Sequence, residues 1–269
     1  LLLPLGVRLS AKESFERHAL SYSPPLSEAE ASAVMAAHLP ASLTQSLFEF
    51  QREGVLFALR HGGRVLVADE MGLGKTVQAI GAALCYPNDW PLLVLCPASL
   101  CANWRTELCR WMGVAGVPHP EAYVHVVRSG RDELRSPNCA TAAEYGEPGT
   151  GVEAGVSIVS YDLATKLCLR LQALRFGVVI CDESHSLKSK GAARTQALLP
   201  LATSATRCLF LSGTPVLSRP IEIFTQASAL RPQIFGTKDK DFAIRYCRGH
   251  VGKFGWDDKG ASNTDSLCA

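Results

Sequence analysis

Short, mostly apolar runs alternate along the chain with stretches whose apolar residues recur at helical spacing. Runs of this kind are typical of strands buried on both faces, as in a parallel sheet covered by helices. We expect strands at Val65–Ala68, Leu92–Cys96, Tyr123–Val127, Val156–Ser160, Val178–Cys181 and Cys208–Leu211. We expect helices over residues 48–61 and at Thr76–Leu84, Leu100–Trp111, Ala192–Leu201 and Ile221–Leu230. The pattern predicts an α/β domain with a mainly parallel central sheet flanked by helices.

The segments outside this alternation are less regular. Residues 1–40 form an N-terminal extension with one short capped helix, which starts after Ser27 and ends near His38. Residues 41–232 form the main domain, and within it the Gly-, Pro- and Ala-rich stretch 134–155 is expected to be a flexible insert. We expect the segment after Pro232, residues 233–269, to be irregular and to lead out of the domain.

Composition narrows the class of protein. With 269 residues, 47% of them hydrophobic, and a net charge of +2, the chain can bury one large core and is neither collagen-like, coiled-coil nor disordered. Its ten cysteines contain no Cys-x-x-Cys pair, which favours a reducing compartment and no structural metal. No apolar run is long enough for a membrane span, so we expect a soluble intracellular protein. Since the sequence does not begin with Met, we expect it to be part of a longer chain.

The small net charge hides an uneven distribution. Residues 186–260, which we call the basic sector, hold twelve Lys and Arg residues and five acidic residues, a net charge of +7. A basic sector of this size fits the surface of a polyanion such as nucleic acid, although solvated lysines give similar runs in many proteins.

A glycine-rich loop follows the first predicted strand and opens a helix. The loop reads Asp69, Glu70, Met71, Gly72, Leu73, Gly74, Lys75 and Thr76. This order predicts a P-loop, in which backbone amides at a helix N-terminus cradle phosphates. Lys75 is expected to reach the β- and γ-phosphates, and the Thr76 hydroxyl to ligate Mg²⁺. Asp69 replaces the usual first glycine of this motif.

Two acids end the strand at 178–181. At the carboxyl edge of a parallel sheet, Asp182 can hold Mg²⁺, while Glu183 can orient and deprotonate the attacking water. Together with Lys75 they form the expected catalytic set. Paired acids alone are often helix caps, so the loop at 72–76 is what makes this interpretation specific.

Further landmarks identify the type of NTPase. Gln51 precedes the phosphate loop, and its amide can pair with both a donor and an acceptor on adenine. The chain has no Asn-Lys-x-Asp guanine reader, so ATP is favoured over GTP. Two hydroxyls flank Gly213 in Ser212-Gly213-Thr214-Pro215, where they can relay the state of the γ-phosphate. The same residues also make a good turn.

These motifs, in this order, resemble those of Swi/Snf-type DNA-dependent ATPases. They lie at Gln51, Asp69–Thr76, Cys96–Leu100 with Trp104 and Glu107, Ser160–Asp162, Asp182–His185 and Ser212–Pro215. The resemblance covers residues 38–267. Within this family, the chain most resembles the HepA-related annealing helicases, which rewind DNA and remodel stalled forks. That narrower match rests on Asp182–His185, Leu217–Pro220, Phe254–Asp257 and Gly260–Asn263.

The resemblance implies further roles. His185, Ser212, Gly213 and Thr214 would couple nucleotide state to DNA. Pro97, Ser99, Ser160 and Tyr161 would face the backbone of double-stranded or forked DNA, independently of sequence and in a salt-sensitive way. It also implies that this domain is a RecA-like P-loop domain and that a second RecA-like lobe lies elsewhere in the protein. A nuclear location and no membrane partner are implied as well.

Three tryptophans bear on the DNA interface. Trp104 and Trp111 lie seven residues apart on one predicted helix face, which favours the core over stacking on bases. For Trp256, stacking and a structural role stay equally open.

Three functions remain open from the sequence. The first is the ATP-driven translocase lobe of an annealing helicase. The second is a nucleotide- and DNA-binding module without turnover of its own, because no second series of strands and helices and no Gln-x-x-Gly-Arg-x-x-Arg stretch follows Thr214. The third is a chromatin-remodelling ATPase of the same superfamily.

Overall fold

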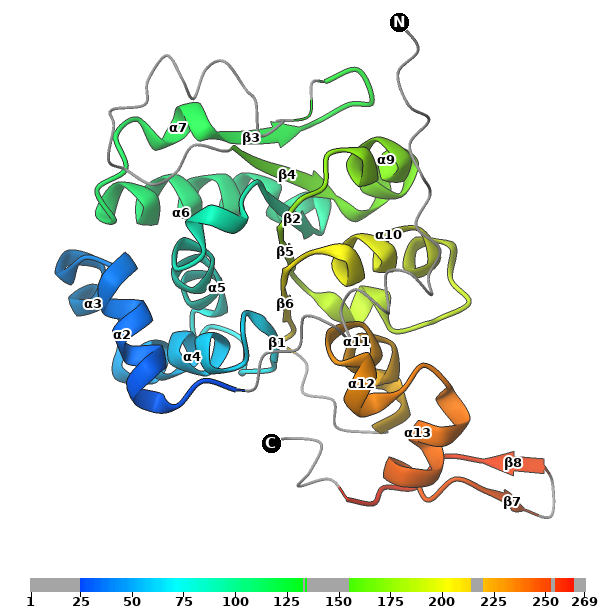
Figure 1. The fold of residues 1–269 in the computed structure, drawn as a ribbon. Coiled ribbons are helices and arrows are strands. Elements are labelled where there is room, and N and C mark those ends of the chain that lie inside the picture. Colours follow the sequence, from blue (N-terminus) through cyan, green and yellow to red (C-terminus); the bar gives the residue numbers. More distant parts are fainter. Residues whose placement is uncertain (1–24, 133, 135–154, 214–219, 253–254, 264–269) are drawn as a thin grey trace, which may run out of the picture.

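A six-stranded parallel sheet runs through the centre of the molecule (Figure 1). The computed structural model describes residues 25–132, 134, 155–213, 220–252 and 255–263. The strands lie side by side in the order β1 (Arg64–Val67), β6 (Arg207–Leu211), β5 (Val178–Cys181), β2 (Leu92–Cys96), β4 (Val156–Ser160) and β3 (Val124–Val127). No strand end differs from its predicted position by more than one residue, and β1 is shifted by one residue at both ends. The predicted α/β class is therefore confirmed.

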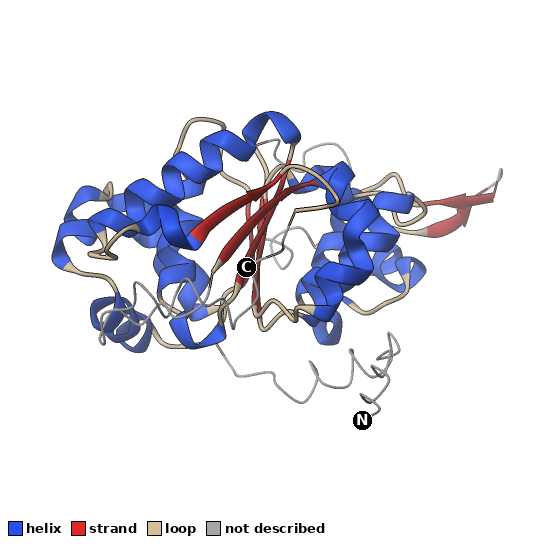
Figure 2. Ribbon diagram, turned by 90° about the horizontal axis from the view of Figure 1, so that it is seen from above, coloured by secondary structure: helices blue, strands red, loops and turns tan. Residues whose placement is uncertain are grey.

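Helices cover both faces of the sheet (Figure 2). One face packs against α2 (Glu28–His38), α3 (Ala41–Ser46), α4 (Glu49–Arg60), α5 (Lys75–Leu84) and α6 (Cys101–Val114), with the short α7 (Pro120–Tyr123) beside them. The other face packs against α9 (Tyr161–Ala173), α10 (Ala193–Ser204) and α11 (Phe224–Leu230). None of the described helices is long and apolar enough to cross a lipid bilayer.

Strand β2 shows why the buried strands carry no polar face. Leu92 and Val94 belong to the core under α2–α6, whereas Leu93 and Leu95 belong to the core under α9–α11. Successive side chains point to opposite faces of a sheet, so a strand covered on both sides must be apolar at every position. The four leucine and valine side chains are fully buried.

The segment after Pro232 is not irregular, so that prediction was wrong. It forms α12 (Pro232–Phe235), α13 (Asp239–Tyr246) and an antiparallel hairpin of β7 (His250–Gly252) and β8 (Gly255–Asp257). Phe242 and Tyr246 of α13 are buried against Phe224 in a small separate core. An eight-residue helix is too short to produce a clear periodic pattern, which explains the error. The predicted insert at 134–155 lies almost entirely outside the described residues.

The N-terminal helix is fixed by a capping box. The Ser27 hydroxyl accepts a hydrogen bond from the Glu30 amide, and the Glu30 carboxylate accepts one from the Ser27 amide at 2.8 Å. Ala31 of this helix is fully buried in the core beneath α4 and α5. The predicted short helix is thus confirmed, and it packs on the main domain.

A buried arginine joins the far end of β1 to two helix ends. The Arg64 guanidinium donates hydrogen bonds to the carbonyl oxygens of Ala202, Ala205, Ala229 and Leu230 at distances of 2.6–3.4 Å. These carbonyls terminate α10 and α11, where helix dipoles favour a cation. Burial lowers the pKa of Arg64, and the charges of nearby arginines add to that effect.

Arg64→Met should destabilise the chain by about 3 kcal/mol, because several buried carbonyls would lose their donor. Arg60→Met, at the exposed last residue of α4, is the matched control. Urea unfolding followed by circular dichroism measures both. Equal unfolding free energies for the two variants would contradict this role of Arg64.

Candidate nucleotide-binding site

The loop between β1 and α5 has a backbone that only glycine adopts easily. Gly72 and Gly74 have φ angles of 88° and 75°, in the left-handed region. A Cβ on Gly74 would also lie 2.4 Å from Nε2 of Gln51, so a side chain there would displace the Gln51 amide. The glycines that the sequence singled out are therefore required by the turn itself.

This loop presents free donors at the start of a ten-residue helix. None of the backbone amides of residues 72–76 has a hydrogen-bond acceptor among the described residues. The Lys75 ammonium lies inside the loop, where it donates to the carbonyl oxygens of Asp69 and Glu70 at 2.8 Å each. Unpaired amides, a cation and a helix N-terminus together suit a phosphate chain. Thr76 follows on the first turn of α5 with its side chain half-buried.

Gln51 lies at the junction of α4 and the phosphate loop. Its Nε2 donates to the Leu73 carbonyl at 3.2 Å, and its Oε1 accepts from the Phe48 amide at 3.1 Å. The amide retains one further N–H and one further lone pair. The structure therefore places Gln51 beside the loop and gives it a role in holding the loop against α4. Its contact with adenine stays a prediction.

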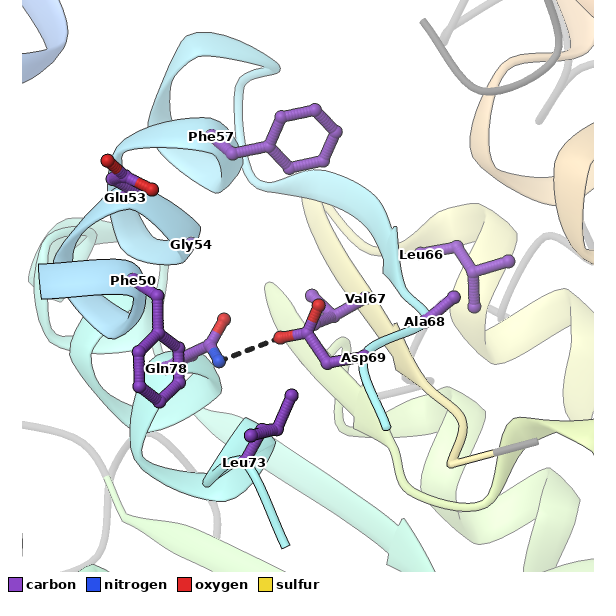
Figure 3. A pocket seen from close by; sticks show the side chains of 10 residues that line it. All are labelled: Phe50, Glu53, Gly54, Phe57, Leu66, Val67, Ala68, Asp69, Leu73 and Gln78. Atoms are coloured by element: carbon purple, nitrogen blue, oxygen red, sulfur yellow. Dashed lines mark hydrogen bonds between the residues drawn. The ribbon is translucent and has the colours of Figure 1, made fainter. Parts of the chain in front are cut away.

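An open pocket of about 730 Å³ lies between α4, β1 and α5 (Figure 3). Phe50 and Phe57 line it from α4, and Leu73 lines it from the phosphate loop. Its polar groups include Asp69, whose carboxylate accepts a hydrogen bond from Gln78 at 2.9 Å. Oε1 of Gln78 is buried and has no hydrogen-bond partner among the residues that the structure describes. Aromatic walls with a few polar groups beside a phosphate loop suit a flat heterocycle.

Asp182 is held from three directions at the end of β5. The indole N–H of Trp104 donates to one carboxylate oxygen at 2.8 Å, and the Glu183 amide donates to the other at 2.9 Å. The Tyr161 hydroxyl donates to the Asp182 carbonyl at 2.7 Å. These bonds fix the orientation of a carboxylate that is only 9% exposed.

Burial is the dominant influence on this carboxylate, and it raises the pKa of Asp182 above its ordinary value. The hydrogen bonds from Trp104 and the Glu183 amide oppose that shift, as does the charge of Lys75. A nearby divalent cation would favour the ionised form further. Such a carboxylate is well suited to bind a metal ion rather than to remain as an isolated buried charge.

Glu183 has a strained backbone. Its φ of 48° is in the left-handed region, which is uncommon for a residue with a side chain. The next residues form a short 3-10 helix, Ser184–Leu187, which Gln226 of α11 fastens through its 2.8 Å bond to the Ser184 carbonyl. The Glu183 carboxylate lies 3.3 Å from Nδ1 of His185, so the predicted base and the predicted coupling residue are in contact.

The turn after β6 lies against the phosphate loop. A Cβ on Gly213 would lie 2.6 Å from Cγ of Met71 and 3.6 Å from the Lys75 ammonium. Ser212, which precedes it, is buried, and its amide donates to the Val67 carbonyl at 3.0 Å. Ser212 and Gly213 therefore lie beside the phosphate loop, and their role in sensing the phosphates stays a prediction. Thr214 is outside the described residues.

The predicted DNA-facing residues fall into two groups. Pro97 and Ser99 follow β2, and Ser160 ends the neighbouring β4, where it pairs in register with Cys96. These three residues share one sheet edge because they lie at or just after the ends of neighbouring parallel strands. Ser99 is exposed, and the other two are half-buried. Tyr161 is buried, and its hydroxyl supports Asp182.

Trp256 lies elsewhere, on β8. Its ring is 39% exposed and lies beneath the Lys240 ammonium at 5.8 Å. A Cβ on Gly249 would lie 2.8 Å from this ring, so the indole packs closely on the backbone there. The geometry gives Trp256 a packing role in the hairpin beside any role in binding.

Two residues make hydrogen bonds in the site that the sequence did not predict. Trp104 is in the core, as expected, but its hydrogen bond to Asp182 was not foreseen. A buried indole N–H needs an acceptor, so a tryptophan predicted in the core could have indicated a polar partner in the site. Gln226 was missed because its partner, Ser184, lies 42 residues away in sequence.

Comparison with known proteins agrees with this geometry. The model of the SNF2-related domain matches residues 50–250. The chain belongs to the SNF2-related domain family. It is 40% identical to a Xenopus laevis SWI/SNF-related matrix-associated actin-dependent regulator of chromatin, subfamily A-like protein 1, over 98% of this chain and 25% of that protein.

Annealing helicases are also among the relatives of this SNF2-related domain. It is 43% identical to the Bos taurus DNA annealing helicase and endonuclease ZRANB3, over 85% of this chain and 20% of that protein. The chain thus spans a quarter or less of the length of these two relatives.

A solved structure supports the fold. The Sulfolobus solfataricus SWI2/SNF2 ATPase core, determined with double-stranded DNA, matches 75% of this chain and 39% of its own, with a TM-score of 0.56 and 21% identity. The RecA-like architecture predicted from the sequence is therefore confirmed.

Trp104→Phe should weaken Mg²⁺-dependent nucleotide binding by about 10- to 100-fold, because it removes a donor that orients a metal ligand. Trp111→Phe is the matched control, since Trp111 lies on the same helix and donates to Glu107 at 2.8 Å instead. The measurement is the Mg²⁺ concentration that half-saturates binding of a fluorescent ATP analogue. The same Mg²⁺ dependence in both variants would show that Trp104 is only a packing residue.

Proposed function

We propose that this SNF2-related domain is the ATP-binding lobe of a double-strand DNA translocase of the annealing-helicase type, acting in DNA rewinding and replication-fork remodelling. The observation that carries the proposal is that the predicted nucleotide-binding residues and the predicted DNA-facing residues lie at the same edge of the sheet, where the strands end. The phosphate loop, Gly213 and Asp182 follow β1, β6 and β5, while Pro97 and Ser160 follow β2 and β4. Nucleotide chemistry and a DNA-facing surface are thus side by side.

The chain's own groups suit ATP hydrolysis. The amides of residues 72–76 and the Lys75 ammonium would bind the phosphates. Thr76 and Asp182 would hold Mg²⁺, which when bound neutralises phosphate charge. Glu183 would orient the attacking water and accept its proton, and its contact with His185 would keep the carboxylate in place. Gln51 would contact the adenine from the base of α4.

Helix α6 offers a direct connection between the DNA-facing segment and the metal ligand. Residues 97–100 lead into α6, and Trp104 on its first turn holds Asp182. A shift of this segment on DNA would move the indole that orients the carboxylate. His185, Ser212 and Thr214 would provide a second connection through the turns that follow β5 and β6.

Electrostatics and the relatives support DNA as the partner. The basic sector carries +7, and phosphate contacts of that kind bind without reading sequence. The relatives' names refer to DNA annealing and to chromatin, which supports a nuclear location for this chain as well. We infer that residues 41–232 are the ATP-binding lobe and that residues 233–269 lead towards a second RecA-like lobe.

A second candidate is a nucleotide- and DNA-binding module with little turnover of its own. Among the described residues after β6, the strands are confined to the small β7–β8 hairpin, so no second RecA-like sheet is present there. In related motors, arginines from another element contribute about 10³-fold or more to phosphoryl transfer. The isolated chain would then bind ATP and hydrolyse it slowly.

Lys75→Ala should weaken binding of a fluorescent ATP analogue by about 100-fold, because charged hydrogen bonds to phosphate contribute about 2–3 kcal/mol. Glu183→Gln should keep binding and lose hydrolysis. Lys166→Ala, at an exposed position on α9, is the control. Affinity for duplex DNA should stay within twofold of wild type in all three. Hydrolysis retained by Glu183→Gln would exclude Glu183 as the base.

The translocase proposal is tested on the protein that carries both lobes. ATP hydrolysis should be several-fold faster with forked DNA than without it, and the protein should rewind a partly melted duplex in an ATP-dependent manner. Equal hydrolysis rates with and without DNA would contradict the proposal. Nucleosome sliding without fork rewinding would favour the chromatin-remodelling alternative.

A further inference from the structure

Two thiols flank the DNA-facing segment at 97–100. Cys96 ends β2 and Cys101 begins α6, and their sulfur atoms are 3.6 Å apart and hydrogen-bonded. Of the eight cysteines in the described part of the chain, these two are the ones that bond to each other. The sequence showed no Cys-x-x-Cys motif, and the pair forms because the chain turns back between the strand and the helix.

The two thiols differ in reactivity. Cys101 accepts the hydrogen bond from Cys96, which lowers the pKa of Cys101 to about 7 although burial opposes the shift. The same hydrogen bond and burial raise the pKa of Cys96. Cys101 is 8% exposed and Cys96 is fully buried. Cys101 is therefore the more accessible of the two thiols and the one that ionises more readily.

We propose that Cys96 and Cys101 are a reversible oxidation site that forms a disulfide with hydrogen peroxide and thereby weakens DNA binding. The Cys101 thiolate attacks one peroxide oxygen, the O–O bond breaks and hydroxide leaves, which gives a sulfenic acid. The Cys96 thiol then attacks that sulfur, the S–O bond breaks and water leaves. Two electrons pass from the thiols to the peroxide, and a dithiol reductant restores them.

We expect bond formation to shift the segment between the two thiols. A disulfide requires a sulfur separation of about 2.05 Å, well below the observed contact. Cys96 is held in the sheet, where β2 pairs with β4 on one side and β5 on the other. We therefore expect the adjustment at the Cys101 end, where it would displace Pro97, Ser99 and the first turn of α6. The loss of DNA affinity rests on the proposed function, whereas the bond itself rests on the geometry alone.

The bond is tested by mass spectrometry of the protein after treatment with hydrogen peroxide. Peptide sequencing should show a linkage between Cys96 and Cys101 that dithiothreitol removes. Cys85 should stay reduced, since burial raises the pKa of its thiol to about 12. Separate oxidation of Cys96 or Cys101 without a linkage between them would overturn the proposal.

The effect on DNA is tested by the affinity for a fluorescently labelled duplex before and after oxidation. The affinity should fall about tenfold and recover with dithiothreitol. Cys101→Ser should be insensitive to peroxide, while Cys109→Ser, at a half-buried thiol on the same helix, should respond like wild type. Formation of the disulfide with unchanged affinity would overturn the switch. A reduced protein that does not bind duplex would contradict the proposed function. The mass measurement would still show whether the disulfide forms.

Discussion

The order of three neighbouring parallel strands determines which segments of the chain meet in the candidate site. Because β6 lies between β1 and β5, the carboxyl ends of all three meet at one edge of the sheet. The phosphate loop, Gly213 and Asp182 follow those ends, so segments more than a hundred residues apart in sequence form one site. Arg64 secures the opposite end of β1 by binding the ends of α10 and α11.

Within that frame, a few buried polar contacts orient the reactive groups. Trp104 holds the Asp182 carboxylate, Gln226 fastens the turn that carries Glu183, and Gln51 holds the phosphate loop. Each links the site to a different helix. The orientation of the acids therefore depends on packing outside the site, and α6 connects them to the segment expected to face DNA.

The sequence predicted the sheet well because strands buried on both faces must be apolar throughout, as at β2 and β5. It predicted the turn before α5 because Gly72 and Gly74 adopt a left-handed backbone that other residues adopt only with strain. It did not predict α13, whose eight residues are too few for a periodic signal. Nor could it predict the bond from Trp104 to Asp182 or the contact of Cys96 with Cys101, since both depend on how distant or turning segments meet in space.

The most direct test of the central claim is a crystal structure of this chain with Mg²⁺, a non-hydrolysable ATP analogue and a short duplex. We expect the phosphates on the amides of residues 72–76, the metal between Thr76 and Asp182, and the DNA backbone at Ser99 and Ser160. Phosphates bound away from this loop, or a duplex bound only at the β7–β8 hairpin, would contradict the account.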